Sequence, residues 1–257
     1  MKLIFGNWKM NLTSAASVAL AAALAKEFKI QNSKFKTLAV GVFPSFDALE
    51  KVHDALEGSS IILGAQDCFW EEKGADTGEE SPAQIKAVGC THVLVGHSER
   101  RNKLGETDEM VNKKLKAALG AGLTPVLCVG ETESQRMGGQ WTVVIESQTR
   151  KGLAGIELSG NRQIVIAYEP VWAIGTGKPC APADAREAHA LIRNTLVELF
   201  GAERAARHFS IIYGGSVEAK NIASYLREEG IDGALVGGAS QKAATFLALI
   251  AAAANSK

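Results

Sequence analysis

Short apolar runs recur along the chain, and each is followed by a segment with helical periodicity. The runs are rich in β-branched and aromatic residues, as buried strands are. They lie at residues 3–5, 38–43, 61–63, 93–95, 125–129, 164–168, 211–213 and 234–236. Their ends fall roughly 33 residues apart, which is the size of one strand–helix unit. The pattern therefore predicts eight such units.

The segments between the runs carry apolar residues at the i, i+4, i+7 spacing of amphipathic helices. Two such stripes are Val111, Leu115, Ala118 and Leu119, and Met137, Trp141, Val144 and Ile145. Capping residues indicate three helix starts, at Ser81 before Pro82, at Thr107 before two acidic residues, and at Ser216.

Strict alternation of strand and helix favours a parallel sheet, and eight units in about 250 residues are the size of a closed (β/α)8 barrel. A doubly wound open sheet shares the strand–helix–strand unit and is the structural alternative. No Pro-, Gly- or Ser-rich linker divides the sequence. We therefore expect residues 1–257 to form a single α/β domain, a closed eight-stranded parallel barrel with its active site at the C-terminal ends of the strands.

Composition argues against several classes of protein. Lys and Arg total 28 of the 257 residues and so do Asp and Glu, so the chain has no net charge and lacks the basic surface of a nucleic-acid-binding protein. The apolar runs are too short for a signal peptide or a membrane span. The cysteines show no metal-ligand spacing; they are Cys68, Cys90, Cys128 and Cys180. We expect a cytoplasmic protein with reduced thiols and with no nucleic acid, membrane or metal partner.

The sixth run ends in a carboxylate, because Glu169 directly follows a segment predicted to be buried on both faces. Pro170 ends the strand, and Gly175 and Gly177 can adopt positive φ, so the apolar residues 171–174 lie between two bends. An apolar loop beside a carboxylate is typical of a hinged lid that excludes water. The alternative is an ordinary connection between strand and helix, which is usually short and polar.

Other polar side chains stand at predicted strand ends. Asn7 and Lys9 follow the first run two residues apart, so they point to the same side of an extended segment. His97 follows the fourth run at the start of a predicted helical turn, where the positive potential of a helix N-terminus favours a neutral imidazole. Alone, Lys9 is equally well explained as a surface lysine and His97 as a structural histidine. Their shared position at strand ends favours a site.

The last two strand ends carry glycine pairs, at 214–215 before Ser216 and at 237–238. Glycines let backbone N–H groups approach a ligand closely, and both pairs precede predicted helices, so we expect a phosphate site there. The connection from 66 to 81 is long for a compact domain and contains two aromatic residues. It predicts a loop that docks on a partner subunit, with disorder as the alternative.

Motifs of other enzyme classes are incomplete or absent. Gly177-Lys178 lacks the earlier glycine and the following hydroxyl of a P-loop, and the segment 96–100 lacks the final glycine of a nucleophile elbow. Neither HExxH nor GxGxxG occurs in the sequence. The sequence therefore gives no support to a nucleotide P-loop enzyme or a serine hydrolase.

Five segments together resemble the triosephosphate isomerase family: NWKMN at 7–11, GHSERR at 96–101, YEPVWAIGTG at 168–177, YGGS at 213–216 and GGAS at 237–240. They occur in the family's order and span nearly the whole chain. The resemblance implies a TIM-barrel fold and the interconversion of dihydroxyacetone phosphate and D-glyceraldehyde 3-phosphate through a cis-enediolate, without a cofactor. It also implies a cytoplasmic homodimer that acts in glycolysis and gluconeogenesis.

The resemblance further implies catalytic roles: Glu169 as the base, His97 as a neutral electrophile, Lys9 as the cation facing the enediolate, Asn7 as a polar partner of the carbonyl, and Glu99 behind them. The pairing of a glutamate base with a neutral histidine is an established example for this family and comes with the resemblance.

Two further sets of residues follow from the same resemblance. The substrate phosphate is bound through backbone N–H groups of Gly175, Ser216, Gly237 and Gly238, and the arm that docks on the partner subunit contains Thr77, Gly78 and Glu79. The chain departs from the family pattern at Glu80, where a neutral residue is usual, and at Gln241, where leucine is common.

Two other functions suit a phosphate-binding barrel. A Schiff-base aldolase needs a lysine at a central strand end, whereas the sixth strand ends in Glu169. A non-catalytic scaffold has no need of Asn7, Lys9, His97 and Glu169, and all of them are present.

Overall fold

The computed structural model describes residues 1–30, 35–175 and 179–256. Within these ranges the chain forms eight parallel strands in sequence order, and β8 pairs with β1 to close the barrel. The strands are β1 (Lys2–Asn7), β2 (Leu38–Phe43), β3 (Ile62–Ala65), β4 (His92–Val95), β5 (Thr124–Val129), β6 (Ile164–Tyr168), β7 (Phe209–Tyr213) and β8 (Gly233–Val236). The predicted closed barrel is confirmed, and the open sheet is excluded.

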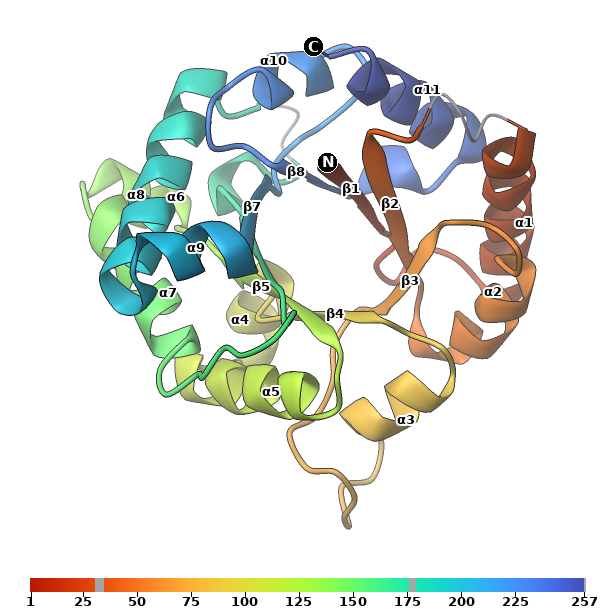
Figure 1. The fold of residues 1–257 in the computed structure, drawn as a ribbon, viewed down its shortest axis with the longest axis horizontal. Coiled ribbons are helices and arrows are strands. Elements are labelled where there is room, and N and C mark those ends of the chain that lie inside the picture. The colour runs from red at the N-terminus through yellow and green to blue at the C-terminus, as the bar shows by residue number, and fades with distance from the viewer. Residues whose placement is uncertain (31–34, 176–178, 257) are drawn as a thin grey trace.

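Helices surround the ring of strands (Figure 1). The α-helices are α1 (Ser14–Ile30), α2 (Leu49–Ala55), α3 (Pro82–Ala87), α4 (Ser98–Leu104), α5 (Asp108–Gly120), α6 (Glu133–Met137), α7 (Trp141–Gly152), α8 (Pro182–Phe200), α9 (Ala202–His208), α10 (Ile222–Leu226) and α11 (Ala243–Ala254). Short 3-10 helices are η1 (Phe46–Ala48), η2 (Val171–Ala173) and η3 (Gly238–Ser240). Because every strand is parallel, all strand C-termini meet at one end of the barrel, where the candidate site lies.

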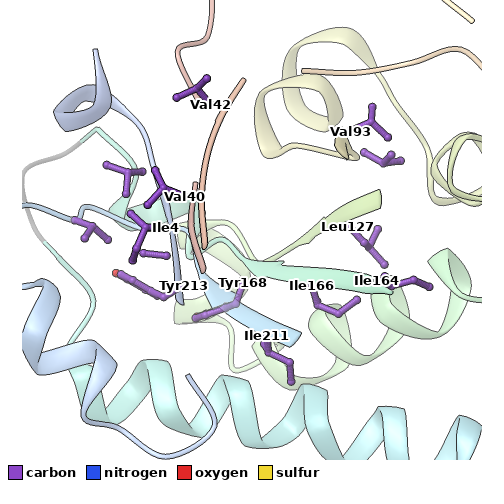
Figure 2. Packing of buried hydrophobic residues seen from close by; sticks show 14 of the residues in the cluster. Ile4, Val40, Val42, Val93, Leu127, Ile164, Ile166, Tyr168, Ile211 and Tyr213 are labelled. Atoms are coloured by element: carbon purple, nitrogen blue, oxygen red, sulfur yellow. The ribbon is translucent and has the colours of Figure 1, made fainter. Parts of the chain in front are cut away.

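The apolar core has two layers. An outer cluster joins strand residues to helix residues, and Figure 2 shows Ile166 and Ile211 of this cluster on β6 and β7, against which α8 packs. An inner cluster of buried residues contains strand residues only, among them Phe5, Val126 and Leu235. Successive residues of a strand point to opposite faces, so these strands are buried on both sides. This explains why they form apolar runs without alternating polar residues.

The helix starts agree only partly with the predictions. Ser81 caps α3 and Thr107 caps α5, and the predicted stripe on α5 is buried. The prediction for Ser216 is wrong, because α10 begins at Ile222. Asn221 explains the delay: its side chain accepts from the N–H of Glu218 and donates to the carbonyl of Ser216, which stabilises a turn instead of a helix.

The stripe predicted from Met137 to Ile145 is also partly wrong. The helix is interrupted at 138–140 between α6 and α7, and Met137 is 83% exposed. Two adjacent glycines, Gly138 and Gly139, account for the break, because Gly139 has a φ of 71°. Ile145 on α7 is buried as predicted.

Backbone pairing is uneven around the barrel. Strands β1 and β2 pair over six residues, from Lys2 with Leu38 to Asn7 with Phe43. Strands β7 and β8 pair only at Tyr213 with Ala234. Further support at this seam comes from Asp232, whose N–H donates to the carbonyl of Ile211 at 2.7 Å and whose carboxylate accepts from the N–H of Ile211 at 2.8 Å.

The part of the chain that the structure describes contains no helix with the length and apolar character of a bilayer span. Its cysteines are all buried and unpaired. Nor do its His, Cys, Asp and Glu side chains form a group of three or more that could hold a metal ion.

Candidate functional site

A cavity of about 860 Å³ opens at the C-terminal ends of the strands. It is lined by every residue predicted from the sequence to be catalytic or phosphate-binding, and not by Glu99, which was predicted to lie behind them; the lining residues include Asn7, Lys9, His97, Glu169, Gly175, Ser216, Gly237 and Gly238. Residues that lie up to 231 positions apart in the sequence therefore face one ligand-sized space. A concave site with a few convergent polar groups is the usual form of a small-molecule site.

Glu169 and His97 contact each other at the base of this cavity. The backbone of Glu169 is fixed where β6 ends, because its N–H donates to the carbonyl of Val129 at 2.7 Å. Its Oε1 lies 3.0 Å from Nε2 of His97, and its Oε2 accepts from the N–H of Ser98 at 2.9 Å. The Glu169 side chain is only 2% exposed. Each oxygen of this buried carboxylate thus has a hydrogen-bonding partner.

Opposing effects act on the pKa of each partner. Burial raises the pKa of Glu169, but His97 and the Ser98 N–H lower it by more, so it lies below its usual value. Burial lowers the pKa of His97, but the Glu169 carboxylate raises it by more, so it lies above its usual value. The rise depends on the contact with Glu169. If the carboxylate moved onto a ligand, the effect of burial would remain and would favour the neutral imidazole.

The other ring nitrogen of His97 fixes the tautomer. His97 caps the N-terminus of α4, and its Nδ1 accepts from the N–H of Glu99 at 3.2 Å. A nitrogen that accepts carries no proton, so the proton of the neutral ring is on Nε2, the atom that faces Glu169. The imidazole therefore presents an N–H donor to the cavity.

Lys9 reaches the same cavity in an unusual backbone conformation. It has a φ of 53°, and in the part of the chain that the structure describes it is the only non-glycine residue with a positive φ. Its N–H donates to Oδ1 of Asn7 at 3.0 Å, and its carbonyl accepts from Nε2 of Gln66 at 2.9 Å. Its Nζ lies 2.7 Å from Oε1 of Glu99, which places Glu99 behind the lysine. Surrounding hydrogen bonds hold a conformation that costs about 1–3 kcal/mol.

The loops after β7 and β8 present backbone groups to the cavity. Within the described residues, the hydrogen-bond pattern leaves the N–H groups of Ser216 and Gly238 without an acceptor. Gly237 precedes η3, and Gly175 has a φ of 72° where the loop after β6 turns. Unpaired N–H groups beside a cavity can bind an anion. The predicted bend at Gly177 lies outside the described residues.

Sequence reasoning missed a buried carboxylate beside the loop after β6. Glu131 is fully buried, and its Oε1 accepts from the hydroxyl of Tyr168 at 3.1 Å and from Nε1 of Trp172 at 2.8 Å. Arg136 lies 3.5 Å from the same oxygen. The available signal was the position of Glu131 two residues after the end of the fifth strand, close to the kind of position that identified Glu169.

Gly130 is required by the close approach of two strand ends. A Cβ at this position would lie 1.8 Å from the carbonyl oxygen of Glu169, far inside van der Waals contact. The glycine therefore allows β5 and β6 to bring their ends together beneath the carboxylate.

The predicted arm residues lie away from the cavity. Thr77, Gly78 and Glu79 are exposed, on a loop that projects beyond α3 (Figure 1). The N–H of Phe69 donates to the carbonyl of Glu80 at 2.8 Å and closes the base of this loop. The ring of Phe69 stacks on Trp70 with centroids 4.0 Å apart. These two contacts fix the base of the loop, and its docking on a partner subunit stays a prediction.

Comparison with known proteins gives a consistent result. The family model described as triosephosphate isomerase matches residues 2–253. Proteins named triosephosphate isomerase from Thermoanaerobacter sp. (strain X514) and Pelobacter propionicus are each 48% identical over 248 residues, which is 96% of this chain and 98% and 97% of theirs. The solved structure of triosephosphate isomerase from Bartonella henselae has a TM-score of 0.85 and 35% identity, and the match covers 98% of both chains. The chain therefore belongs to the triosephosphate isomerase family, the members of which are aldose–ketose isomerases.

Proposed function

We propose that this enzyme interconverts dihydroxyacetone phosphate and D-glyceraldehyde 3-phosphate through a cis-enediolate. The observation that carries the proposal is the convergence of Glu169, His97 and Lys9 on one cavity that also holds the backbone of Ser216 and Gly238. A base, two oxygen-stabilising groups and an anion site are the parts that proton transfer next to a carbonyl requires.

Glu169 is the proposed base. When the substrate binds, the Glu169 carboxylate would move away from Nε2 of His97. It would then take a proton from the carbon next to the substrate carbonyl. General-base catalysis of this kind contributes about 10²- to 10⁴-fold. The same carboxylate returns the proton to the neighbouring carbon, and the hydroxyl proton passes from the oxygen of the first carbon to that of the second, which together convert ketose to aldose.

His97 and Lys9 are proposed to stabilise the oxygen that becomes negative. The imidazole is neutral in this role, because the N–H of Glu99 keeps Nδ1 unprotonated and leaves Nε2–H as the donor. Lys9 adds a positive charge, and Asn7 contacts the carbonyl side of the substrate. Each oriented donor is worth about 10²- to 10³-fold in turnover.

The substrate phosphate takes no part in the chemistry and provides binding energy. We assign it to backbone N–H groups of Gly175, Ser216, Gly237 and Gly238, which line the same cavity as Lys9. Its binding would bring the apolar loop after Pro170 over the site. Excluding water strengthens the interactions with the enediolate and prevents the intermediate from losing phosphate.

The proposed assembly is a homodimer of single-domain subunits in the cytoplasm. Support comes from the ordered, exposed loop that contains Thr77, Gly78 and Glu79. Met10, directly after Lys9, is 94% exposed, and an apolar side chain this open suits a covered interface. We infer that the arm of the partner subunit covers this region.

A coupled assay with dihydroxyacetone phosphate tests the proposal. We expect turnover that phosphoglycolate, a mimic of the enediolate, inhibits more strongly than inorganic phosphate does. Lys9→Met should lower both substrate affinity and turnover, whereas Lys51→Met on the exposed surface of α2 should change neither. Absence of turnover, or unchanged kinetics in Lys9→Met, would contradict the assignment.

A further inference from the structure

The peptide group before Lys9 is held at both of its polar atoms. Its N–H belongs to Lys9 and donates to Oδ1 of Asn7. Its carbonyl belongs to Trp8 and accepts from Nδ2 of Asn11 at 3.1 Å and from Nε2 of Gln241 at 3.3 Å. The φ angle of Lys9 measures the rotation between this peptide group and the Cα atom that carries the Lys9 side chain. Hydrogen bonds to the group therefore fix the backbone from which the Lys9 side chain extends toward Glu99.

Gln241 differs from the other donors in where it comes from. It follows η3, in the loop after β8, whereas Asn7 ends β1 and Asn11 belongs to the loop that carries Lys9. The backbone N–H of Gln241 donates to the carbonyl of Gly238 at 3.2 Å, and its side chain lines the cavity. A single residue thus connects the proposed phosphate loop to the backbone of Lys9.

We propose that Gln241 is a positioning residue for Lys9, because its amide holds the Trp8 carbonyl and so keeps the ammonium directed at the reacting oxygen. This inference rests on the proposed function, in which Lys9 stabilises the enediolate. Leucine has a similar size to glutamine but no donor. In this chain the amide therefore supplies an additional constraint on Lys9.

The decisive variant is Gln241→Leu, which keeps the volume and removes the donor. A typical hydrogen bond contributes about 1 kcal/mol, so we expect kcat/KM to fall about fivefold to tenfold, mainly through kcat. Binding of phosphoglycolate, which occupies the phosphate site and mimics the enediolate, should weaken by a similar factor. Inhibition by inorganic phosphate should weaken by less, because that ion has no atom in the place of the reacting oxygen. Gln241→Glu, which also lacks the donor, should lose at least as much.

A matched control is available at the opposite end of the barrel. Nε2 of Gln163, just before β6, donates to the carbonyl of Arg207 at 2.9 Å, so Gln163→Leu removes the same kind of contact far from the site. It should leave all three kinetic measurements unchanged. If Gln163→Leu and Gln241→Leu behave alike, or if Gln241→Leu weakens inorganic phosphate as much as phosphoglycolate, Gln241 has only a structural role and the inference is wrong.

A double variant tests whether the effect passes through Lys9. In a Lys9→Met background, Gln241→Leu should have little further effect on kcat/KM, because the group that it positions is gone. Additive losses would refute the inference. This outcome is separable from failure of the proposed function: a wild-type enzyme without isomerase activity refutes the function, whereas an active enzyme sensitive to Lys9→Met and insensitive to Gln241→Leu refutes this inference alone.

Discussion

Replacing Asp67 by asparagine should stabilise the protein at pH 8 and have little effect at pH 4. Asp67 follows β3, and its side chain is 5% exposed within a cluster of four charged groups. Its Oδ2 lies 2.7 Å from Nζ of Lys114 and 2.8 Å from Nε of Arg100, and both cations also contact Glu106. Removing two carboxylates and two cations from water is costly even when they are well paired.

The magnitude follows from the pKa of the Asp67 carboxyl. Burial raises it from 3.8 to about 6, an effect that Lys114 opposes and Glu106 reinforces. Between these values the folded protein binds more protons than the unfolded chain, so stability falls as pH rises through this window. At about 1.36 kcal/mol per pKa unit, the loss is about 3 kcal/mol at pH 8.

Asparagine cannot ionise and therefore avoids this loss. Lys114 and Arg100 keep Glu106 as a partner but lose the charge of Asp67, so the net gain at pH 8 should be about 1–3 kcal/mol. At pH 4 the folded wild type already holds the proton on Asp67, and the difference should be within about 0.5 kcal/mol.

Urea unfolding at pH 4, 6 and 8, at one fixed protein concentration, measures these differences. Asp54→Asn is the matched control, because Asp54 is exposed on α2 and the chemical change is the same. Its effect gives the baseline for this chemical change at each pH. If Asp67→Asn is less stable than wild type at pH 8, the attraction of Lys114 and Arg100 outweighs burial and the reasoning is refuted. A difference that is the same at pH 4 and pH 8 would refute it equally.

Three further predictions concern the site and the assembly. Glu169→Asp should keep phosphoglycolate binding and lower turnover on the order of 10²-fold, because the carboxylate retreats by about 1 Å; unchanged turnover in the coupled assay would exclude it as the base. Gly130→Ala should lower thermal stability and turnover, because the new Cβ would clash with the Glu169 carbonyl. Gly120→Ala is the control and should be tolerated, because no atom lies within 4 Å of a Cβ placed there. Equal melting temperatures of the two variants would argue against the close approach at Gly130. Sedimentation should give a dimer at assay concentrations, and a fully active monomer would argue against the arm.

The barrel and the main polar residues of the site were predictable because both depend on order along the sequence. Parallel strands bring their C-terminal ends together, so Asn7, His97 and Glu169 could be assigned to one site from their places after apolar runs. The contact between His97 and Glu169 is a consequence of that topology.

Contacts between side chains and distant backbone were not predictable. The positive φ of Lys9 was not predictable from its neighbours alone, because Gln66 and Gln241 from other loops also contribute hydrogen bonds that hold it. The late start of α10 depends on the hydrogen bonds of Asn221 to its neighbours. The capping preference of Ser216 does not indicate these bonds. The sequence pattern therefore predicts which side chains face the site. Hydrogen bonds between distant segments then determine how those side chains are oriented.

The short pairing of β7 with β8 has a mechanical consequence. The ring is joined least where Tyr213 meets Ala234, and the proposed phosphate loops extend from the two strands on either side of that joint. An anion bound by both loops would link β7 to β8 across this joint. Ligand binding would therefore stabilise the pairing of these two strands as well as occupy the site. Amide hydrogen exchange in β7 and β8 should slow more with phosphoglycolate than exchange in β1 and β2, and equal slowing would show that the joint does not yield.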